Sequence, residues 1–344
     1  MRRALLFMAL ILLVGACADS EPETPESLRL LAHDSFANEV TDQTFAAFTE
    51  ATGIEVEVIA GSDAGSMVNQ AALSKDNPLA DVMFGVDDTF LSRALDEEIF
   101  IEHASPLLGS VVAGLHPESP LVTPIDYGDV CLNYDKAWFD ENQISVPTTL
   151  DQLRDPVYAG ILTVEHPATS SPGLAFMLST VLEYGEERWL DFWEELKAGG
   201  VGVVPDWDTA YYSDFTPYGG ESAMVVSYAS SPPAEVVFAT EPIDEAPTGV
   251  IEAGCYRQVE YAGILDGTSY PEAAGQLIDY MLSVEFQETI PLTWYVFPAN
   301  RDAELPQVFI DNTLIPSQPA RFAAVTVAEN RDRWIAEWVN VMEG

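Results

Sequence analysis

The sequence predicts an α/β protein of two lobes with a cleft between them. Short apolar segments of strand length alternate with segments of helical periodicity along most of the chain, which is typical of layered α/β folds. The chain has 344 residues, and folded sequence is expected from Leu28 onward. A folded region of that size favours two units over one.

The first lobe is predicted to begin with three strands separated by two helices. Residues 27–33 form a strand that leads into a loop, and residues 43–53 form a helix that ends in glycine. Apolar and acidic residues alternate over 54–60, which predicts a second strand. A helix at 67–74 and a buried strand at 80–87 complete this unit.

The second lobe is expected between two crossing segments. Residues 121–135 are expected to carry the chain out of the first lobe, and residues 258–265 to bring it back. Between them, helical patterns cover 171–182 and 188–196, and an apolar run at 222–228 predicts a strand. We therefore assign residues 28–125 and 259–344 to the first lobe and residues 126–258 to the second.

The N-terminus has the pattern of an export signal. Two arginines follow Met1, residues 4–14 are almost wholly apolar, and small residues precede Cys17, which resembles a bacterial lipobox. The apolar run of about 11 residues is short of the roughly 20 that a membrane-spanning helix needs. We expect a signal peptide at 1–16 and a lipid on Cys17; the alternative is a plain secretory signal cleaved nearby.

Residues 17–27 are predicted to be a flexible tether between lipid and fold. After the cysteine they contain two prolines, several acidic residues and no large apolar side chain. Such a stretch buries too little surface to offset the entropy of ordering it. The protein is therefore expected outside the cytoplasm, anchored to the outer face of the cell membrane or in the periplasm.

The charge is strongly negative, with 56 acidic against 14 basic residues and a formal net charge of −42. This excludes nucleic acid as a partner, because binding a phosphate backbone requires clustered lysine and arginine. One interpretation is a solvated acidic surface suited to salty surroundings. The other is a negative field that concentrates cationic ligands near the cleft.

Cys131 and Cys255 are expected to form a disulfide. Both lie in strand-like stretches of a chain predicted to be exported, where oxidised pairs persist. The alternative is a free nucleophilic cysteine, which requires a base within hydrogen-bond reach.

Seven segments in order resemble the substrate-binding proteins of bacterial thiamine ABC importers, a family of the two-lobed periplasmic binding proteins. The resemblance covers nearly all of the chain after the tether and implies a type II fold with a ligand cleft. It implies capture of thiamine or its phosphates by a monomer that delivers them to a membrane permease, with no cofactor, no metal ligand and no catalytic residue. The segments are His33-Asp-Ser-Phe, Ala80-Asp-Val with Gly85-Val-Asp, Asp126-Tyr-Gly, Thr169-Ser-Ser-Pro-Gly-Leu, Ser227-Tyr-Ala-Ser-Ser-Pro, Ile290-Pro-Leu-Thr-Trp and Arg333-Trp-Ile-Ala-Glu-Trp.

The resemblance also implies a set of ligand-binding residues. Indole rings suit the cationic thiazolium ring of thiamine, and hydroxyl groups suit its aminopyrimidine. The implied residues are His33, Asp63, Ala64, Ser170, Ser171, Trp207, Tyr228, Ala229, Ser230, Ser231 and Trp294.

Two of these positions have simpler structural interpretations. Asp63 precedes a predicted helix and can act only as its cap. Ser170 and Ser171 precede a proline at another helix start, where capping alone explains the sequence. Free N–H groups there also suit an anion, which a phosphorylated ligand would provide.

The sequence departs from some relatives at two aromatic positions. His33 stands where they have tyrosine, and Ala234 stands where they have a further tyrosine. The predicted aromatic cage around the ligand is therefore thinner in this chain.

Two rival functions fit the same fold. A thiamine-degrading enzyme would use Cys131 as a free nucleophile, and a ferric-ion carrier would use paired phenolates such as Tyr211 and Tyr212. The thiamine-type segments elsewhere in the chain favour a binding protein that catalyses nothing.

Overall fold

The computed structural model describes residues 24–117 and 119–344. The predicted signal peptide, the lipid-attachment residue Cys17 and the tether up to residue 23 lie outside the described residues. Within the described part, no helix combines the length and the apolar composition needed to cross a membrane.

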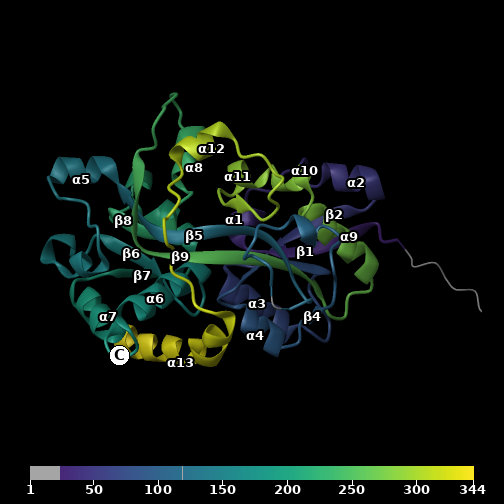
Figure 1. Cartoon of the computed structure of the whole chain (residues 1–344), viewed down its shortest axis with the longest axis horizontal. Coiled ribbons are helices and arrows are strands. Elements are labelled where there is room, and N and C mark those ends of the chain that lie inside the picture. Colours follow the sequence, from purple (N-terminus) through teal and green to yellow (C-terminus); the bar gives the residue numbers. More distant parts are fainter. Residues whose placement is uncertain (1–23, 118) are drawn as a thin grey trace, which may run out of the picture.

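A mixed sheet of ten strands runs through the described part of the chain (Figure 1). Its order is β2-β1-β3-β9-β5-β8-β6-β7, with β4 beside β9 and β10 beside β5. The strands are β1 Ser27–Ala32, β2 Glu55–Ala60, β3 Val82–Asp87, β4 Phe100–Ile101, β5 Thr123–Asp135, β6 Leu162–Glu165, β7 Gly202–Val204, β8 Met224–Tyr228, β9 Thr248–Leu265 and β10 Phe297–Pro298.

Helices pack around this sheet, and a few single turns connect them. The α-helices are α1 Asp34–Ala37, α2 Ala46–Thr52, α3 Ala64–Leu73, α4 Leu91–Asp96, α5 Lys136–Asn142, α6 Ser171–Tyr184, α7 Trp189–Ala198, α8 Pro232–Val237, α9 Pro271–Met281, α10 Val284–Gln287, α11 Ile290–Thr293, α12 Gln307–Asn312 and α13 Ala324–Glu343. Short 3-10 turns are η1 Leu108–Ser110, η2 Leu150–Arg154, η3 Pro156–Tyr158 and η5 Thr216–Tyr218, and η4 Thr209–Asp214 is a π-helix.

The three predicted strands of the first unit correspond to β1, β2 and β3, which pair in parallel. The helix after β2 begins at Ala64, three residues before the predicted Met67. Asp63 explains the earlier start, because its side chain accepts a 2.7 Å hydrogen bond from the Ala64 N–H and caps the helix. Gly53 ends α2 in the left-handed conformation that favours glycine, with φ of 76°.

Two long antiparallel strands, β5 and β9, join the two halves of the sheet (Figure 1). They contain 13 and 18 residues and pair from Thr123 opposite Ala262 to Asp135 opposite Thr248. The predicted lobe boundaries after residues 125 and 258 fall inside these strands. The assignment of 28–125, 126–258 and 259–344 to separate lobes stays a prediction.

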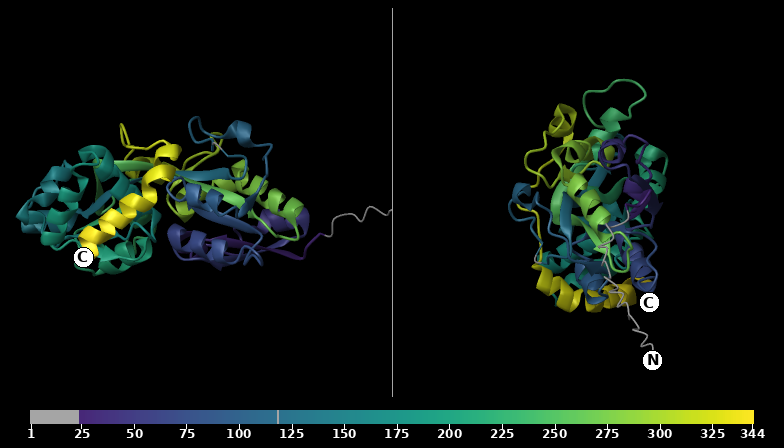
Figure 2. Two further views of the ribbon diagram at one scale, coloured as in Figure 1. Left: turned by 90° about the horizontal axis from the view of Figure 1, so that it is seen from below. Right: turned by 90° about the vertical axis from the view of Figure 1, so that its right-hand side faces the viewer.

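The C-terminal helix α13 spans both halves. It packs against α7 in one half and α4 in the other. In Figure 2 it crosses the face turned toward the viewer in the left view and lies at the lower edge in the right view. Its residues Trp334 and Trp338 are among the largest fully buried side chains, together with Trp189 and Trp193 of α7. Much of the apolar core therefore depends on this helix.

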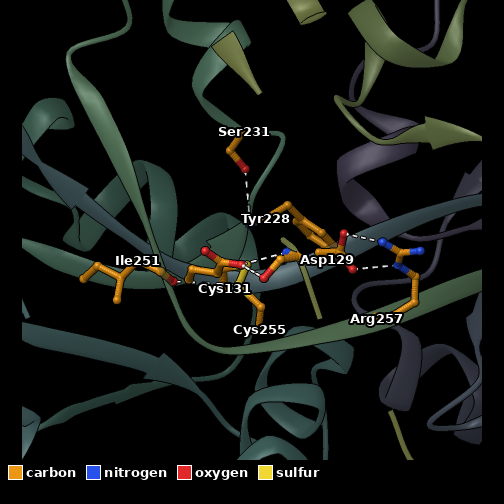
Figure 3. The surroundings of a disulfide bond; sticks show 9 residues. Asp129, Cys131, Tyr228, Ser231, Ile251, Cys255 and Arg257 are labelled. Atoms are coloured by element: carbon orange, nitrogen blue, oxygen red, sulfur yellow. Dashed lines mark hydrogen bonds and ion pairs between the residues drawn. A yellow bond between two sulfur atoms is a disulfide. The ribbon is translucent and has the colours of Figure 1, made fainter. Parts of the chain in front are cut away.

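The predicted disulfide between Cys131 and Cys255 is confirmed (Figure 3). It joins β5 to β9 with a Cα–Cα distance of 4.3 Å, and both cysteines are buried. The register of β5 against β9 shifts between Val130 and Leu132, so Cys131 lies at an irregularity of the ladder. Beside it, Arg257 donates to both carboxylate oxygens of Asp129 at 2.6 and 2.7 Å.

Candidate functional site

A cleft lies between the two halves of the sheet and contains about 850 Å³ of atom-free space, including the part open to solvent. Its walls come from the ends of elements on both sides. Asp63 precedes α3, Ser171 begins α6, Tyr228 ends β8 and Trp294 follows α11. Open α/β sheets bind ligands at such edges, where strands end and loops are free to vary.

Most of the residues that the sequence predicts for binding meet in this cleft. Four others lie buried behind it, each at most 1% exposed: Ala64, Ser170, Ala229 and Ser230. The predicted residues that line it are His33, Asp63, Ser171, Trp207, Tyr228, Ser231 and Trp294.

The position of His33 depends on a glycine in β3. Gly85 has φ of 98°, and a Cβ atom there would overlap the His33 ring. The ring nitrogen Nδ1 of His33 accepts a 3.2 Å hydrogen bond from the Phe36 N–H and caps α1. The segment Gly85-Val-Asp is therefore needed for packing next to the cleft.

Two indole rings in the cleft are held by hydrogen bonds from their N–H groups. Trp207 donates to Ser227 Oγ at 2.9 Å and stacks on Tyr211 with a centroid distance of 4.9 Å. Trp294 donates to Asp126 Oδ2 at 3.1 Å, and its ring meets Phe36 edge to face. Both tryptophans are partly exposed and line the cleft, so their apolar faces are available to a flat ligand.

Tyr228 belongs to a chain of side-chain hydrogen bonds that joins β8 to β9 and β9 to the start of α6. Its hydroxyl donates to Gln258 Oε1 at 3.0 Å, and Gln258 Nε2 donates to Ser171 Oγ at 2.9 Å. A Cβ atom on Gly128 would lie 2.6 Å from the Tyr228 ring, so this ring needs glycine beside it. The network holds the Tyr228 ring in a fixed orientation at the cleft wall.

Acidic side chains form the floor of the cleft. Glu260 Oε2 lies 3.4 Å from His33 Nε2. Burial raises the pKa of Glu260 to about 8, and burial followed by the charge of Glu260 raises the pKa of Asp126 well above its ordinary value. Burial lowers the pKa of His33, against the opposing effect of nearby carboxylates. The floor is thus rich in carboxyl groups and poor in positive charge.

The side chain of Asp63 contacts the first residues of two helices, α3 and α6. Its Oδ1 accepts from the N–H of Ala64 in α3 at 2.7 Å and from the N–H of Ser171 in α6 at 3.5 Å. Burial raises its pKa. A carboxylate of the protein therefore lies at the helix start where the sequence predicts room for an anion.

The cleft is also lined by residues that the sequence did not predict as part of the site. Glu260 gave no signal, because one more glutamate in a strand is unremarkable among 56 acidic residues. Asp208 accepts hydrogen bonds from Ser35 and Asn38 across the cleft at 3.2 and 3.1 Å. The further lining residues are Ser35, Asn38, Glu39, Asp208, Tyr211, Tyr212, Ala234, Phe238, Glu260, Thr293, Tyr295 and Val296.

Two groups invoked by the rival functions, Cys131 and Tyr211, have other partners. The sulfur of Cys131 is part of the disulfide and is not a free thiol. The hydroxyl of Tyr211 donates to Glu235 at 2.9 Å, and its ring stacks on Trp207. In the described residues, no group of three or more histidine, cysteine or carboxylate side chains is arranged to hold a metal ion.

Residues 77–318 match the family model of the bacterial extracellular solute-binding proteins. This chain belongs to that family. Individual relatives of this solute-binding protein resemble it over most of their own length. Their similarity therefore extends beyond residues 77–318.

Two curated relatives illustrate this. The thiamine-binding periplasmic protein of Salmonella typhimurium is 29% identical over 334 residues, which cover 96% of this chain and 97% of the relative. The thiamine-binding periplasmic protein of Escherichia coli is 29% identical over 293 residues, which cover 85% of each chain.

Solved structures confirm the predicted type II periplasmic binding protein fold. A periplasmic thiamin binding protein superposes with a TM-score of 0.81 at 26% identity, covering 92% of this solute-binding protein and 96% of the other chain. Iron-bound HitA from Pseudomonas aeruginosa superposes with a TM-score of 0.73 at 20% identity, covering 92% and 99%. The second likeness concerns the fold alone.

Proposed function

We propose that this solute-binding protein captures thiamine in the cleft and delivers it to the membrane permease of an ABC importer. The observation that carries the proposal is the lining itself: the indoles of Trp207 and Trp294 face a space whose floor is acidic. Thiamine joins a flat aminopyrimidine to a flat thiazolium ring that carries a permanent positive charge. A cation over an indole face gains about 0.5 to 2 kcal/mol, and the carboxyl groups of the floor add to this attraction when they are ionised.

The hydrogen-bonding groups of the cleft suit the remaining parts of thiamine. The aminopyrimidine carries an amine, for which Asp63 and Glu260 are acceptors. Tyr228 and Ser231 add hydroxyl groups to the same lining. The thiamine-binding periplasmic proteins that this chain resembles support the same ligand.

The protein acts as a monomeric receptor outside the cytoplasm and catalyses nothing. Support for a role without catalysis comes from Cys131, whose sulfur is bonded to Cys255. Processing before Cys17 would give a lipid-anchored N-terminus. The tether would then end at residue 26, because Ser27 already belongs to β1. This arrangement holds the cleft close to the permease while leaving the lobes in solvent.

Isothermal titration calorimetry of the purified protein with thiamine tests the proposal, and tryptophan fluorescence should fall as thiamine binds. Trp294→Ala should weaken binding at least tenfold, because it removes a ring face and leaves Asp126 without its N–H donor. Trp138→Ala is the matched control, since Trp138 lies on α5 and does not line the cleft. The proposal would be contradicted if Trp294→Ala bound thiamine as tightly as the wild type, or if titration of the wild type with thiamine gave no binding heat.

A further inference from the structure

A largely exposed phenylalanine lines the mouth of the cleft. Phe238 directly follows α8 and is 64% exposed, whereas Glu260 on the floor of the same cleft is 7% exposed. A single exposed apolar side chain is common on protein surfaces and carries no conclusion by itself. Phe238 differs because it belongs to the cleft lining, so a ligand that fills the cleft would cover its ring.

Helix α8 directs Phe238 toward the cleft. The N–H of Phe238 donates to the carbonyl of Ala234 at 2.9 Å, so the two residues lie one helical turn apart. Both line the cleft, and Ala234 is buried. Because Ala234 has no side chain beyond Cβ, the ring of Phe238 is the aromatic group that this helix presents to the cleft.

Phe238 contacts Tyr295 across the mouth of the cleft. Their ring centroids are 5.9 Å apart and the ring planes meet at 67°, an edge-to-face arrangement. Phe238 comes after β8 and α8 in one half of the sheet. Tyr295 comes after Trp294, whose ring packs against Phe36 in the other half. The pair therefore joins the two walls of the cleft on its solvent side.

Tyr295 has an unusual backbone conformation. Its φ is 57°, in the left-handed region that residues other than glycine seldom adopt. Successive side chains of an extended chain point to opposite faces, but Trp294, Tyr295 and Val296 all line the cleft. The Tyr295 ring is buried in an apolar cluster with Ala234 and Phe297, and its hydroxyl has no hydrogen-bond partner among the described residues. Packing therefore fixes this ring, and backbone outliers held in this way are found at ligand clamps.

We propose that Phe238 and Tyr295 form an aromatic latch at the mouth of the cleft, in which Phe238 covers the solvent side of bound thiamine. The inference rests on the proposed function and adds a binding residue to it. A phenyl face attracts the cationic thiazolium ring, and Phe238 loses contact with water when a flat ring lies beneath it. Because the two residues come from different halves, the latch requires the halves to be close together. It should therefore slow release of the ligand more than it speeds entry.

Calorimetry and stopped-flow tryptophan fluorescence with thiamine on the purified protein test this. Phe238→Ala should weaken thiamine binding at least fivefold, mostly through faster dissociation. Phe238→Tyr keeps the aromatic face and should stay within twofold of the wild type. Tyr295→Phe should do the same, because the hydroxyl that it removes has no partner within the described chain.

Val237→Ala is the matched control. Val237 precedes Phe238 at the end of α8 and is also exposed, but it is not part of the cleft lining. This variant should keep both the affinity and the dissociation rate within twofold of the wild type.

A double-mutant cycle of Phe238→Ala and Tyr295→Leu tests the pairing of the two rings. The combined loss of affinity should be smaller than the product of the two single losses, since either change opens the latch. Melting curves establish that each variant is folded. If Tyr295→Leu is not, the comparison of Phe238→Ala with Phe238→Tyr and Val237→Ala decides the role of Phe238 by itself.

The outcomes separate this inference from the proposed function. Failure of the wild type to bind thiamine contradicts the proposed function. Binding by the wild type with unchanged affinity in Phe238→Ala overturns the latch and leaves the proposed function standing; slower thiamine uptake by cells carrying that variant would then assign the ring to the permease surface. Equal losses in Phe238→Ala and Val237→Ala, or a combined loss equal to the product of the single losses, would also overturn the latch.

Discussion

Removing the disulfide between Cys131 and Cys255 should destabilise the apoprotein without changing thiamine recognition. The bond closes a loop with a sequence separation of 124. In the chain-entropy description a loop of that length contributes about 5 kcal/mol at 25 °C, because it restricts the unfolded chain. For a protein of this size, unfolding entropy converts that into a fall in melting temperature of about 7 °C.

The assay is differential scanning calorimetry of wild-type protein and of the double variant Cys131→Ala with Cys255→Ala. Both sulfurs lie outside the cleft lining, so the thiamine dissociation constant should stay within twofold of wild type. The single variant Cys255→Ala serves as a control, since it also lacks the bond and should melt close to the double variant. A double variant that melts within about 1 °C of the wild type would refute the reasoning that this bond restricts the unfolded chain.

Three further predictions follow from the cleft and the N-terminus. In calorimetry, Trp207→Ala should weaken thiamine binding at least tenfold, and Trp207→Phe should weaken it less because it keeps an aromatic face. Equal losses of affinity in the two variants would contradict a stacking role for Trp207. Glu260 has a pKa raised from 4.5 to about 8, so its proton stabilises the apo fold fully below about pH 4.5, and that contribution is lost as pH rises through 8. Thiamine affinity should instead increase over the same range, and Glu260→Gln should flatten that pH profile in calorimetry; an unchanged profile in the variant would exclude Glu260 as the titrating group. Cys17→Ser should move the protein from the membrane fraction to the soluble extracytoplasmic fraction on immunoblots, whereas retention on membranes would contradict lipid attachment at Cys17.

The first three strands could be predicted because their residues follow simple patterns. Alternation over 54–60 and the apolar run at 80–87 are local signals, and both segments form strands of the sheet. The start of β9 was not predictable in this way. It begins at Thr248, ten residues before the expected 258, because polar residues such as Glu252 and Arg257 interrupt the apolar pattern on a strand whose pairing comes from β5.

Some residues of the candidate site could likewise be predicted from local sequence, and others could not. Trp207 and Trp294 are large, rare side chains whose position in a motif is informative, and both line the cleft. Glu260 and Asp208 gave no comparable signal, since their roles arise from groups that lie 30 or more positions away along the chain. His33 illustrates the reason: its orientation depends on the missing side chain of Gly85, a tertiary contact that local sequence does not encode.

The central position of β9 has a consequence for the order in which this chain can fold. Strand β3 pairs with β9 from Val82 opposite Ile264, and β5 pairs with it along nearly its whole length. A chain delivered from its N-terminus therefore exposes the open edges of β3 and β5 until Leu265 has emerged. Open strand edges are templates for aggregation, and distant pairings slow folding. In a chain that emerges from its N-terminus, completion of the central sheet therefore has to wait for the residues of β9.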